Sequence, residues 1–373
     1  MKFNKKKIVL LTSLALSSQA FAATVYENDT MKVDISGAFL MDYWKPVHLL
    51  DDHDFNTSRS TLGFGVEQQL GNGWSGDVKF EWDNLTSAPS DESGTKSDDQ
   101  FRTRLGYFSI HNEELGSLRF GKQYSVYHDV AGYMDNLIVF DPDATPLFSD
   151  GKDGGFMATA RGDDLVTYRK SFDNLNLSVQ HGFKGVQNTS QDVKRDSNYA
   201  LAASYDFDNG ISLGATHMVN KIKTTAGTMN LEASDEQKIT TVAVKYSYEA
   251  FKVAAAYTDG TKAHETDLLA YSFNAADPNT PLKTNKYADA EGMDIYAEYY
   301  FAIGLRPYVY LSNVDFDDGS IQGERSIYSM GLSYHAAPNF IISGEVRKTS
   351  EEDVDLAGKH EDTLTGITVI YAF

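Results

Sequence analysis

Apolar and polar residues alternate with a period of two from Met31 to Phe373, and this alternation limits the folds that the chain can adopt. In one segment, Leu175, Leu177 and Val179 fall on one side, with polar residues between them. Successive side chains of a β-strand point to opposite faces, whereas apolar residues of an amphipathic helix recur every three or four positions. No long stretch has the helical spacing, so the sequence predicts an all-β fold.

The segments between the predicted strands alternate between short and long. Seven are tight turns, most of which contain Gly, Asn, Asp or Pro, and eight are longer polar stretches. Short turns at one rim and long loops at the other are typical of bacterial outer-membrane β-barrels. The pattern therefore predicts a sixteen-stranded antiparallel transmembrane β-barrel. The predicted turns span 71–73, 112–116, 173–174, 208–210, 249–250, 302–304 and 337–339, and the predicted loops span 45–56, 86–98, 125–160, 186–197, 223–235, 260–290, 316–323 and 349–360.

The first 22 residues have the features of an export signal. Four lysines precede the apolar run from Ile8 to Leu16, and Ala20-Phe21-Ala22 fits a cleavage site of secreted proteins. The apolar run is shorter than the ~20 residues that a membrane-spanning helix needs. We therefore expect a signal peptide at 1–22 and one barrel domain at 23–373, because closing a barrel uses both ends of the chain.

Two features of the composition that would conflict in a soluble protein agree in a barrel. The mean hydropathy is polar, at −0.39, yet 12% of the residues are aromatic. A membrane barrel has an apolar outer face with aromatic girdles, and a polar lumen and loops. The net charge is −20, and loss of the four lysines in the signal would make it −24, which disfavours binding to nucleic acid.

The residue patterns of common enzyme and metal sites are missing from the sequence. The chain has no Cys, its nine His residues form no His-Glu-x-x-His pattern, and it contains no Gly-x-Ser-x-Gly element. Gly71-x-Gly73-x-x-Gly76 has the spelling of a dinucleotide-binding motif, but it lies between two predicted strands, which favours a tight turn. We therefore expect no enzymatic activity, no cofactor and no metal centre.

Several segments, spread over the whole mature chain, resemble the general porins of enterobacterial outer membranes. The most specific is the middle block, which begins at Gly116-Ser117-Leu118-Arg119-Phe120-Gly121-Lys122-Gln123-Tyr124 and continues with Asp129-Val130-Ala131-Gly132-Tyr133-Met134-Asp135. The supporting segments are Arg102-Thr103-Arg104-Leu105, Thr167-Tyr168-Arg169, Gly304-Leu305-Arg306-Pro307 and Tyr371-Ala372-Phe373.

The resemblance implies a homotrimer in the outer membrane, surrounded by lipid and lipopolysaccharide. It also implies that the third long loop, which starts near Tyr124, folds inward to form a constriction where acidic loop residues face arginines on the wall. Asp135 takes the acidic position on the loop, and Arg104 and Arg161 take basic positions on the wall. Arg102 has the same strand parity as Arg104, so we expect it to face the lumen as well.

The sequence departs from the pattern of this family in the constriction. Val139 stands where the family has a second loop carboxylate, and Asp141 or Asp143 is the candidate substitute. A wall arginine of the family is replaced by Thr61, with Arg59 two residues earlier, and a wall lysine is replaced by Ala38. We expect a constriction of altered charge and width.

The resemblance implies a channel for passive diffusion of ions and small hydrophilic solutes. Opposed charges across a narrow neck set up a transverse field, which aligns dipolar solutes. The acidic total favours a mild preference for cations, and the cluster of arginines opposes it.

Two alternative functions and one further partner stay open at this stage. Aromatic residues such as Tyr308, Tyr310, Tyr133 and Phe140 would suit a porin specific for oligosaccharides, and the long loops would suit a surface adhesin or phage receptor. Acidic clusters such as Asp315 to Asp318 are typical of solvated loops. They would also suit carboxylates that share Ca²⁺ or Mg²⁺ with lipopolysaccharide phosphates.

Overall fold

The fold was derived from a computed structural model, which describes residues 22–44, 54–83, 102–147, 157–183, 187–188, 193–224, 234–265, 287–317, 322–353 and 358–373. The predicted signal peptide lies outside the described residues, apart from its last position. Within the described part, no helix is long and apolar enough to cross a membrane.

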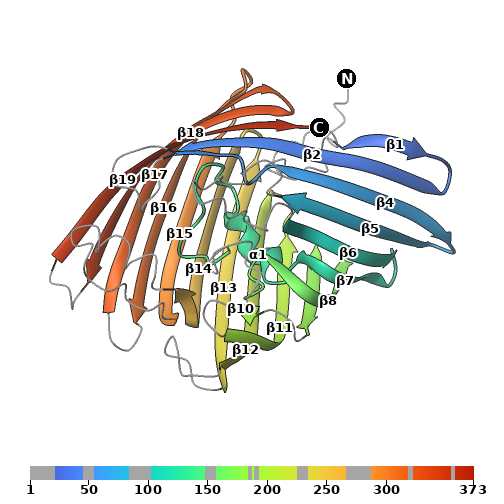
Figure 1. The fold of residues 1–373 in the computed structure, drawn as a ribbon, viewed down its shortest axis with the longest axis horizontal. Coiled ribbons are helices and arrows are strands. Elements are labelled where there is room, and N and C mark those ends of the chain that lie inside the picture. The colour runs from blue at the N-terminus through green and yellow to red at the C-terminus, as the bar shows by residue number, and fades with distance from the viewer. Residues whose placement is uncertain are drawn as a thin grey trace, which may run out of the picture.

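Sixteen long strands form a closed antiparallel ring, as the sequence predicted (Figure 1). Each strand pairs with its neighbours in the chain order, and β19 pairs with β2 to close the ring. The strands of the ring are β2 (Met31–Trp44), β4 (Thr61–Gly71), β5 (Trp74–Asp83), β6 (Arg102–Asn112), β7 (Gly116–Tyr124), β8 (Arg161–Phe172), β9 (Leu175–Gly182), β11 (Val193–Asp206), β12 (Ile211–Thr224), β13 (Ser234–Tyr248), β14 (Phe251–Glu265), β15 (Tyr287–Tyr299), β16 (Leu305–Asp317), β17 (Gln322–Ala337), β18 (Phe340–Asp353) and β19 (Gly358–Ala372).

Three short strands were not predicted: β1 (Ala23–Glu27), β3 (Asp54–Asn56) and β10 (Gln187–Asn188). β1 pairs with the first half of β2, while β19 pairs with the second half. At the junction, the backbone of Phe373 exchanges two hydrogen bonds with Gly37, of 2.8 and 2.9 Å. β1 therefore continues the row that β19 begins, so that the two strands complete the wall together.

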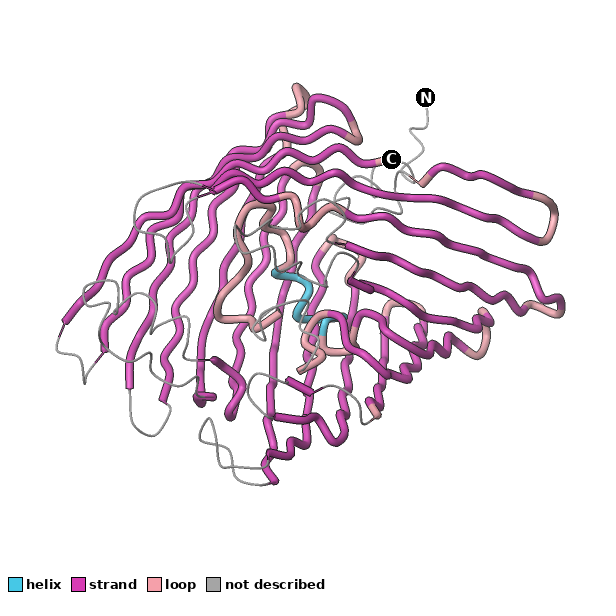
Figure 2. Tube along the Cα trace, viewed as in Figure 1, coloured by secondary structure: helices cyan, strands magenta, loops and turns pink. Residues whose placement is uncertain are grey.

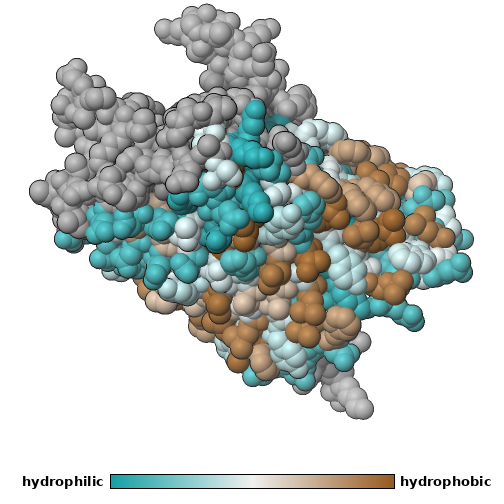
Figure 3. Space-filling model, turned by 90° about the horizontal axis from the view of Figure 1, so that it is seen from below, coloured by the Kyte–Doolittle hydropathy of each residue, from teal (hydrophilic) through white to brown (hydrophobic). Residues whose placement is uncertain are grey.

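The wall has an apolar outer face and a polar inner face, which explains the alternation in the sequence. On β9, Leu177 and Val179 are 40% and 54% exposed, whereas Ser178 and Gln180 face inward and are buried. The hydrophobic outer surface forms a band that is flanked by hydrophilic surface (Figure 3). Aromatic pairs, stacked or edge-on, lie at the short-turn ends of β11, β13 and β15. They are Tyr205 with Phe207, Tyr246 with Tyr248, and Tyr299 with Phe301.

The alternation predicted the seven tight turns correctly, and several strands extend further into the predicted loops than expected. β14 runs to Glu265, although its loop was expected from Gly260. We had expected Arg102 to face the same side as Arg104 because the two lie two positions apart on one strand. That argument was incomplete, because a β-bulge interrupts the pairing of β5 with β6. Glu81 pairs with Leu105 and Trp82 with Thr103, so Arg104 is the extra residue.

The third long loop folds into the barrel, and its first part forms the short helix α1 (His128–Ala131) followed by a 3₁₀ turn at Gly132–Met134 (Figures 1 and 2). Val126, Tyr127, Val130 and Met134 of this loop are buried against the inner wall. Small side chains leave room for the loop there, notably Ala200, Ala202, Ala243, Ala254 and Ala256. The loop therefore fills one side of the lumen.

We predict that Leu201→Arg lowers the free energy of unfolding in lipid vesicles by about 2–4 kcal/mol, because it places a charge on the lipid face. Leu201 is 56% exposed and lies between the outward-facing Tyr199 and Tyr205 of β11. Phe207→Arg, at the short-turn rim, should lower it by about 0–1 kcal/mol. Equal losses at both positions would contradict the assignment of the membrane band.

Candidate functional site

The third loop is fixed to the wall from its first residues. The backbone N–H of Ser125 donates to the carbonyl of Ala160 at 2.8 Å, which closes the base of the loop. The Val126 N–H donates to the side-chain oxygen of Gln180 at 2.7 Å. The buried Tyr127 hydroxyl lies 2.7 Å from the Thr241 hydroxyl, so the loop reaches β13 three residues after the end of β7.

Three polar contacts set the orientation of α1 and the turn after it. Asp129 accepts two hydrogen bonds from the Arg169 guanidinium, at 2.8 and 3.0 Å. The His128 Nε2 lies 3.3 Å from the Asp135 carboxylate. Bidentate Arg–carboxylate pairs are geometrically specific, so the pair with Arg169 fixes where α1 lies in the lumen.

The next part of the loop is held by cations and carboxylates on the opposite wall. The Asn136 carbonyl accepts a hydrogen bond of 3.0 Å from Arg306. Asp143 forms a 2.8 Å ion pair with Arg325, and both side chains are at most 10% exposed. The backbone N–H of Thr145 donates to Asp294 at 2.7 Å. These contacts attach the back of the loop to β15, β16 and β17.

The loop tip lies where β18, β19 and β2 meet. Ile138 is buried in an apolar cluster with Ala38 and Leu40 of β2, and its carbonyl accepts a 3.1 Å hydrogen bond from Arg59. The Arg347 guanidinium lies over the Phe140 ring, 4.8 Å from its centroid. It also donates to the Asp141 carbonyl at 2.9 Å. The Asp141 side chain is exposed to the lumen.

Arginines on the side of the barrel that faces the loop lie beside carboxylates of the wall. Arg59 makes a bidentate pair with Asp42, Arg102 makes one with Asp83, and Arg104 pairs with Glu81 at 3.2 Å. In each pair the arginine is more exposed than the carboxylate, for example 37% for Arg59 against 4% for Asp42. The guanidinium groups are therefore presented to the lumen, with the carboxylates behind them.

The two loop carboxylates have pKa values that differ in direction. Burial raises the pKa of Asp135, but its hydrogen bond with His128 and the charges of His128, Arg161 and Arg104 together leave it below the ordinary value. The Asp141 carboxylate opens onto the lumen, but the surrounding loop and wall partly desolvate it, which raises its pKa more than the charges of Arg59 and Arg347 lower it. Asp135 is thus the more strongly acidic of the two.

The sequence had singled out seven residues, and the structure brings five of them together. The charges of Arg104 and Arg161 act on Asp135, and those of Arg59 and Arg161 act on Asp141. Arg102 pairs with Asp83 on the neighbouring strand. Asp143 lies instead in the contact between loop and wall, paired with Arg325. Arg161 is buried and donates to the Tyr124 hydroxyl at 2.9 Å.

Sequence reasoning missed the residues that hold the loop from behind. Arg306 was noted only as part of a segment that resembles the family, while Arg325, Arg347 and Asp294 were not noted at all. Each occupies an inward position in its strand and is buried. A charged residue at a predicted inward position was therefore the signal that could have identified these residues as partners of the loop. Tyr308 and Tyr310 do face inward, but they are 3% and 0% exposed and bond to Glu345 and Asp294. They are therefore covered and do not offer open rings to a passing solute.

The chain was compared with protein families and with known proteins. Residues 10–354 match the family described as Gram-negative porin. The chain belongs to this family. It is an outer-membrane porin, and it forms a channel for the passive diffusion of ions and small hydrophilic solutes.

Relatives of similar length support this assignment. The porin is 27% identical to outer membrane protein F of Serratia marcescens, over 98% of both chains. It is 23% identical to the outer membrane porin PhoE of Salmonella typhimurium, over 99% of this chain and all of the relative. The solved structure of Salmonella typhi OmpF in complex with daunomycin has the same fold, with a TM-score of 0.72 and 19% identity over 94% of this chain and all of that one.

Proposed function

We propose that the pore is narrowest where Asp135 and Asp141 of the loop face the arginines of the wall. The wall side comprises Arg59, Arg102, Arg104 and Arg161. The observation that carries this proposal is the tethering of the loop on both sides, because a fixed loop inside the lumen leaves solutes only the remaining space. Asp143 has a different role in this proposal, which is to anchor the loop.

We propose a mild preference for cations. Each of Arg59, Arg102 and Arg104 has a wall carboxylate at ion-pair distance, so its charge is largely offset when seen from a distance. Among the proposed constriction residues, this leaves the two negative charges of Asp135 and Asp141 opposed by the one positive charge of Arg161. Acidic side chains that line a narrow section favour cations over anions.

The porin is expected to act as a homotrimer after removal of residues 1–22, as the family resemblance implies. Five phenylalanines on neighbouring strands give the outer face of β2 and β4–β7 a large apolar surface that suits contact between copies. They are Phe39, Phe64, Phe80, Phe108 and Phe120, and they are 37–45% exposed. Lipid and lipopolysaccharide would surround the rest of the wall.

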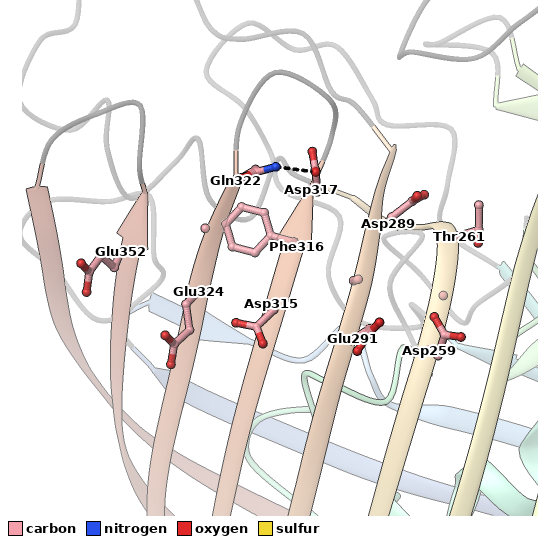
Figure 4. A pocket seen from close by; sticks show the side chains of 13 residues that line it. Asp259, Thr261, Asp289, Glu291, Asp315, Phe316, Asp317, Gln322, Glu324 and Glu352 are labelled. Carbon is pink, nitrogen blue, oxygen red and sulfur yellow. Dashed lines mark hydrogen bonds between the residues drawn. The ribbon is translucent and has the colours of Figure 1, made fainter.

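The long-loop ends of β14 to β18 carry a row of outward-facing carboxylates (Figure 4). The row is Asp259, Glu291, Asp315, Glu324 and Glu352, all exposed. Among the described residues, no group of three or more His, Asp or Glu could hold a metal ion. A divalent cation bound there would therefore need phosphate ligands from lipopolysaccharide as well, which is the bridging role that we propose for this row.

Other functions have less support. We expect no enzymatic activity, since the geometry described above serves to hold the loop. A porin specific for oligosaccharides would need open aromatic rings along the path, and the burial of Tyr308 and Tyr310 weighs against it. A role as adhesin or phage receptor depends on loops that lie largely outside the described residues, and it is compatible with transport.

Two charge changes test the constriction. We predict that Asp135→Asn lowers the preference for cations and that Arg104→Ala raises it, because each removes one charge from the narrowest section. The measurement is the reversal potential of single channels in a planar bilayer with a salt gradient. Unchanged reversal potentials in both variants would show that the constriction has been placed wrongly.

The pH dependence of selectivity tests the two loop carboxylates separately. Because the pKa of Asp141 is raised, its negative charge should be lost first as the pH falls, whereas Asp135 keeps its charge into more acidic solution. The preference for cations should therefore fall in two steps, and Asp141→Asn should remove the step at higher pH. A titration curve that Asp141→Asn leaves unaltered would refute this assignment.

Chelation tests the proposed partners. If divalent cations link the carboxylate row to lipopolysaccharide, EDTA should lower the melting temperature of the oligomer on semi-native gels and reduce its lipopolysaccharide content. Neutralising Glu291, Asp315 and Glu324 to Gln or Asn should make the oligomer insensitive to EDTA. An oligomer that responds to EDTA equally with and without these substitutions would argue against bridging at this row.

A further inference from the structure

A half-open pocket lies inside the barrel on the short-turn side of α1. It is a cavity of about 330 Å³ between α1, Tyr133 and the inner faces of β8, β9, β11 and β13. Small-molecule sites in proteins have volumes from roughly 300 to 1,000 Å³. The cavity is lined by Asp129 and Arg169, and by Lys245 and Asp206 nearer the short-turn rim, whereas the constriction residues Asp135 and Asp141 do not line it.

The charges of Asp129 and Arg169 satisfy each other. Their bidentate ion pair leaves no net charge at the α1 end of the cavity, and Arg169 also donates to the Tyr124 carbonyl and the Thr167 hydroxyl. This pair therefore serves to position α1. It does not supply an unsatisfied charge to a ligand.

Lys245 presents its ammonium group to the cavity without a carboxylate beside it. No ion pair of the described residues involves this ammonium, on which the charge of Asp206 acts only from beyond ion-pair distance. Its close contact is with the Tyr133 ring, 4.3 Å from the centroid. A cation over an aromatic face is stabilised by the ring, but its hydrogen-bond donors stay available. Lys245 can therefore bind a carboxylate that enters the cavity.

Asp206 presents a carboxylate to the same space. It accepts hydrogen bonds from the Ser212 hydroxyl at 2.5 Å and from the Asn176 amide at 2.9 Å, and within the described chain it has no cation at ion-pair distance. Ser212 stands opposite Lys245 across the β12–β13 pair and opposite Asp206 across the β11–β12 pair. Asp206 and Lys245 are thus separated by one strand, which places their backbones roughly 10 Å apart.

We propose that this cavity binds small zwitterionic solutes of the amino-acid class. The solute's carboxylate would bind to Lys245 and its ammonium group to Asp206. Of the five charged residues that line the cavity, Lys170 donates its ammonium protons to the carbonyls of Glu113 and Glu114. The other four carry two positive and two negative charges, so neither a simple anion nor a simple cation is favoured overall. Because the two available charges are held apart by Tyr133 and by Ser212 with Asn176, a ligand that carries both charges complements them best.

This inference rests on the chain conducting solutes, and it adds a second binding step after the constriction. A zwitterion that has been aligned by the constriction would next meet Lys245 and Asp206 on the short-turn side of the loop. Weak binding there would raise the local concentration of these solutes at the inner mouth of the pore.

The test uses the full-length mature porin and L-glutamine as the zwitterionic probe. N-acetyl-L-glutamine, which lacks the ammonium group, and L-glutaminamide, which lacks the carboxylate, are the matched probes. Equilibrium dialysis of the detergent-purified protein and solute-induced current noise in planar bilayers should both give saturable binding of glutamine, at least about tenfold tighter than that of either analogue. Lys245→Met and Asp206→Asn should each weaken glutamine binding by about tenfold.

Two control variants keep the result interpretable. Lys238→Met removes an outward-facing lysine from the same strand and should leave glutamine binding unchanged, and Lys245→Arg keeps the positive charge and should retain it. Equal binding of all three probes, or glutamine binding that neither Lys245→Met nor Asp206→Asn reduces, would overturn the proposal. Open channels without specific glutamine binding would refute this inference alone, whereas a failure to form channels would refute the proposed function.

Discussion

The closed ladder of backbone hydrogen bonds is the constraint on which the rest of the structure depends. A bilayer offers no partner to an unpaired N–H or C=O group, so a wall of strands is stable in lipid only if it has no edge. Here the pairing of β19 with β2 closes the ring, and β1 covers the part of β2 that β19 does not reach. Once the wall is closed, alternate side chains must face lipid and lumen, which fixes the polarity of nearly every strand position.

A closed wall leaves a wide interior, which the third loop partly fills. Burying the polar groups of the loop there costs free energy. Inside the barrel, an unsatisfied charge would be strongly destabilising. The wall meets this requirement with buried cations and carboxylates opposite the loop: Arg306, Arg325, Arg347 and Asp294. Removing one member of such a buried pair is generally far more damaging than never having had the pair. The loop and these wall residues therefore form one unit.

The fold could be read from the sequence because its signal is periodic and local. The alternation predicted the number of long strands and the seven turns. It did not predict the bulge at Arg104, which re-aims a side chain without changing the ring. The role of Asp143 could not be read in this way. Asp141 and Asp143 have the same residue type and lie two positions apart, yet one is exposed to the lumen and the other pairs with Arg325. That difference depends on the path of an irregular loop, which no period describes.

The ion pairs between arginines and carboxylates of the wall limit which charges of the pore can change without altering its structure. Arg59, Arg102 and Arg104 are tied to Asp42, Asp83 and Glu81, so altering one of these arginines also leaves a buried carboxylate uncompensated. The exposed carboxylate of Asp141 is not part of such a pair, although its backbone carbonyl binds Arg347. Substitution of this side chain changes the charge of the lumen while the loop keeps its tethers. The departure from the family pattern at Asp141 therefore falls where charge can vary with little structural consequence, whereas Val139 is buried and a charge there would be costly.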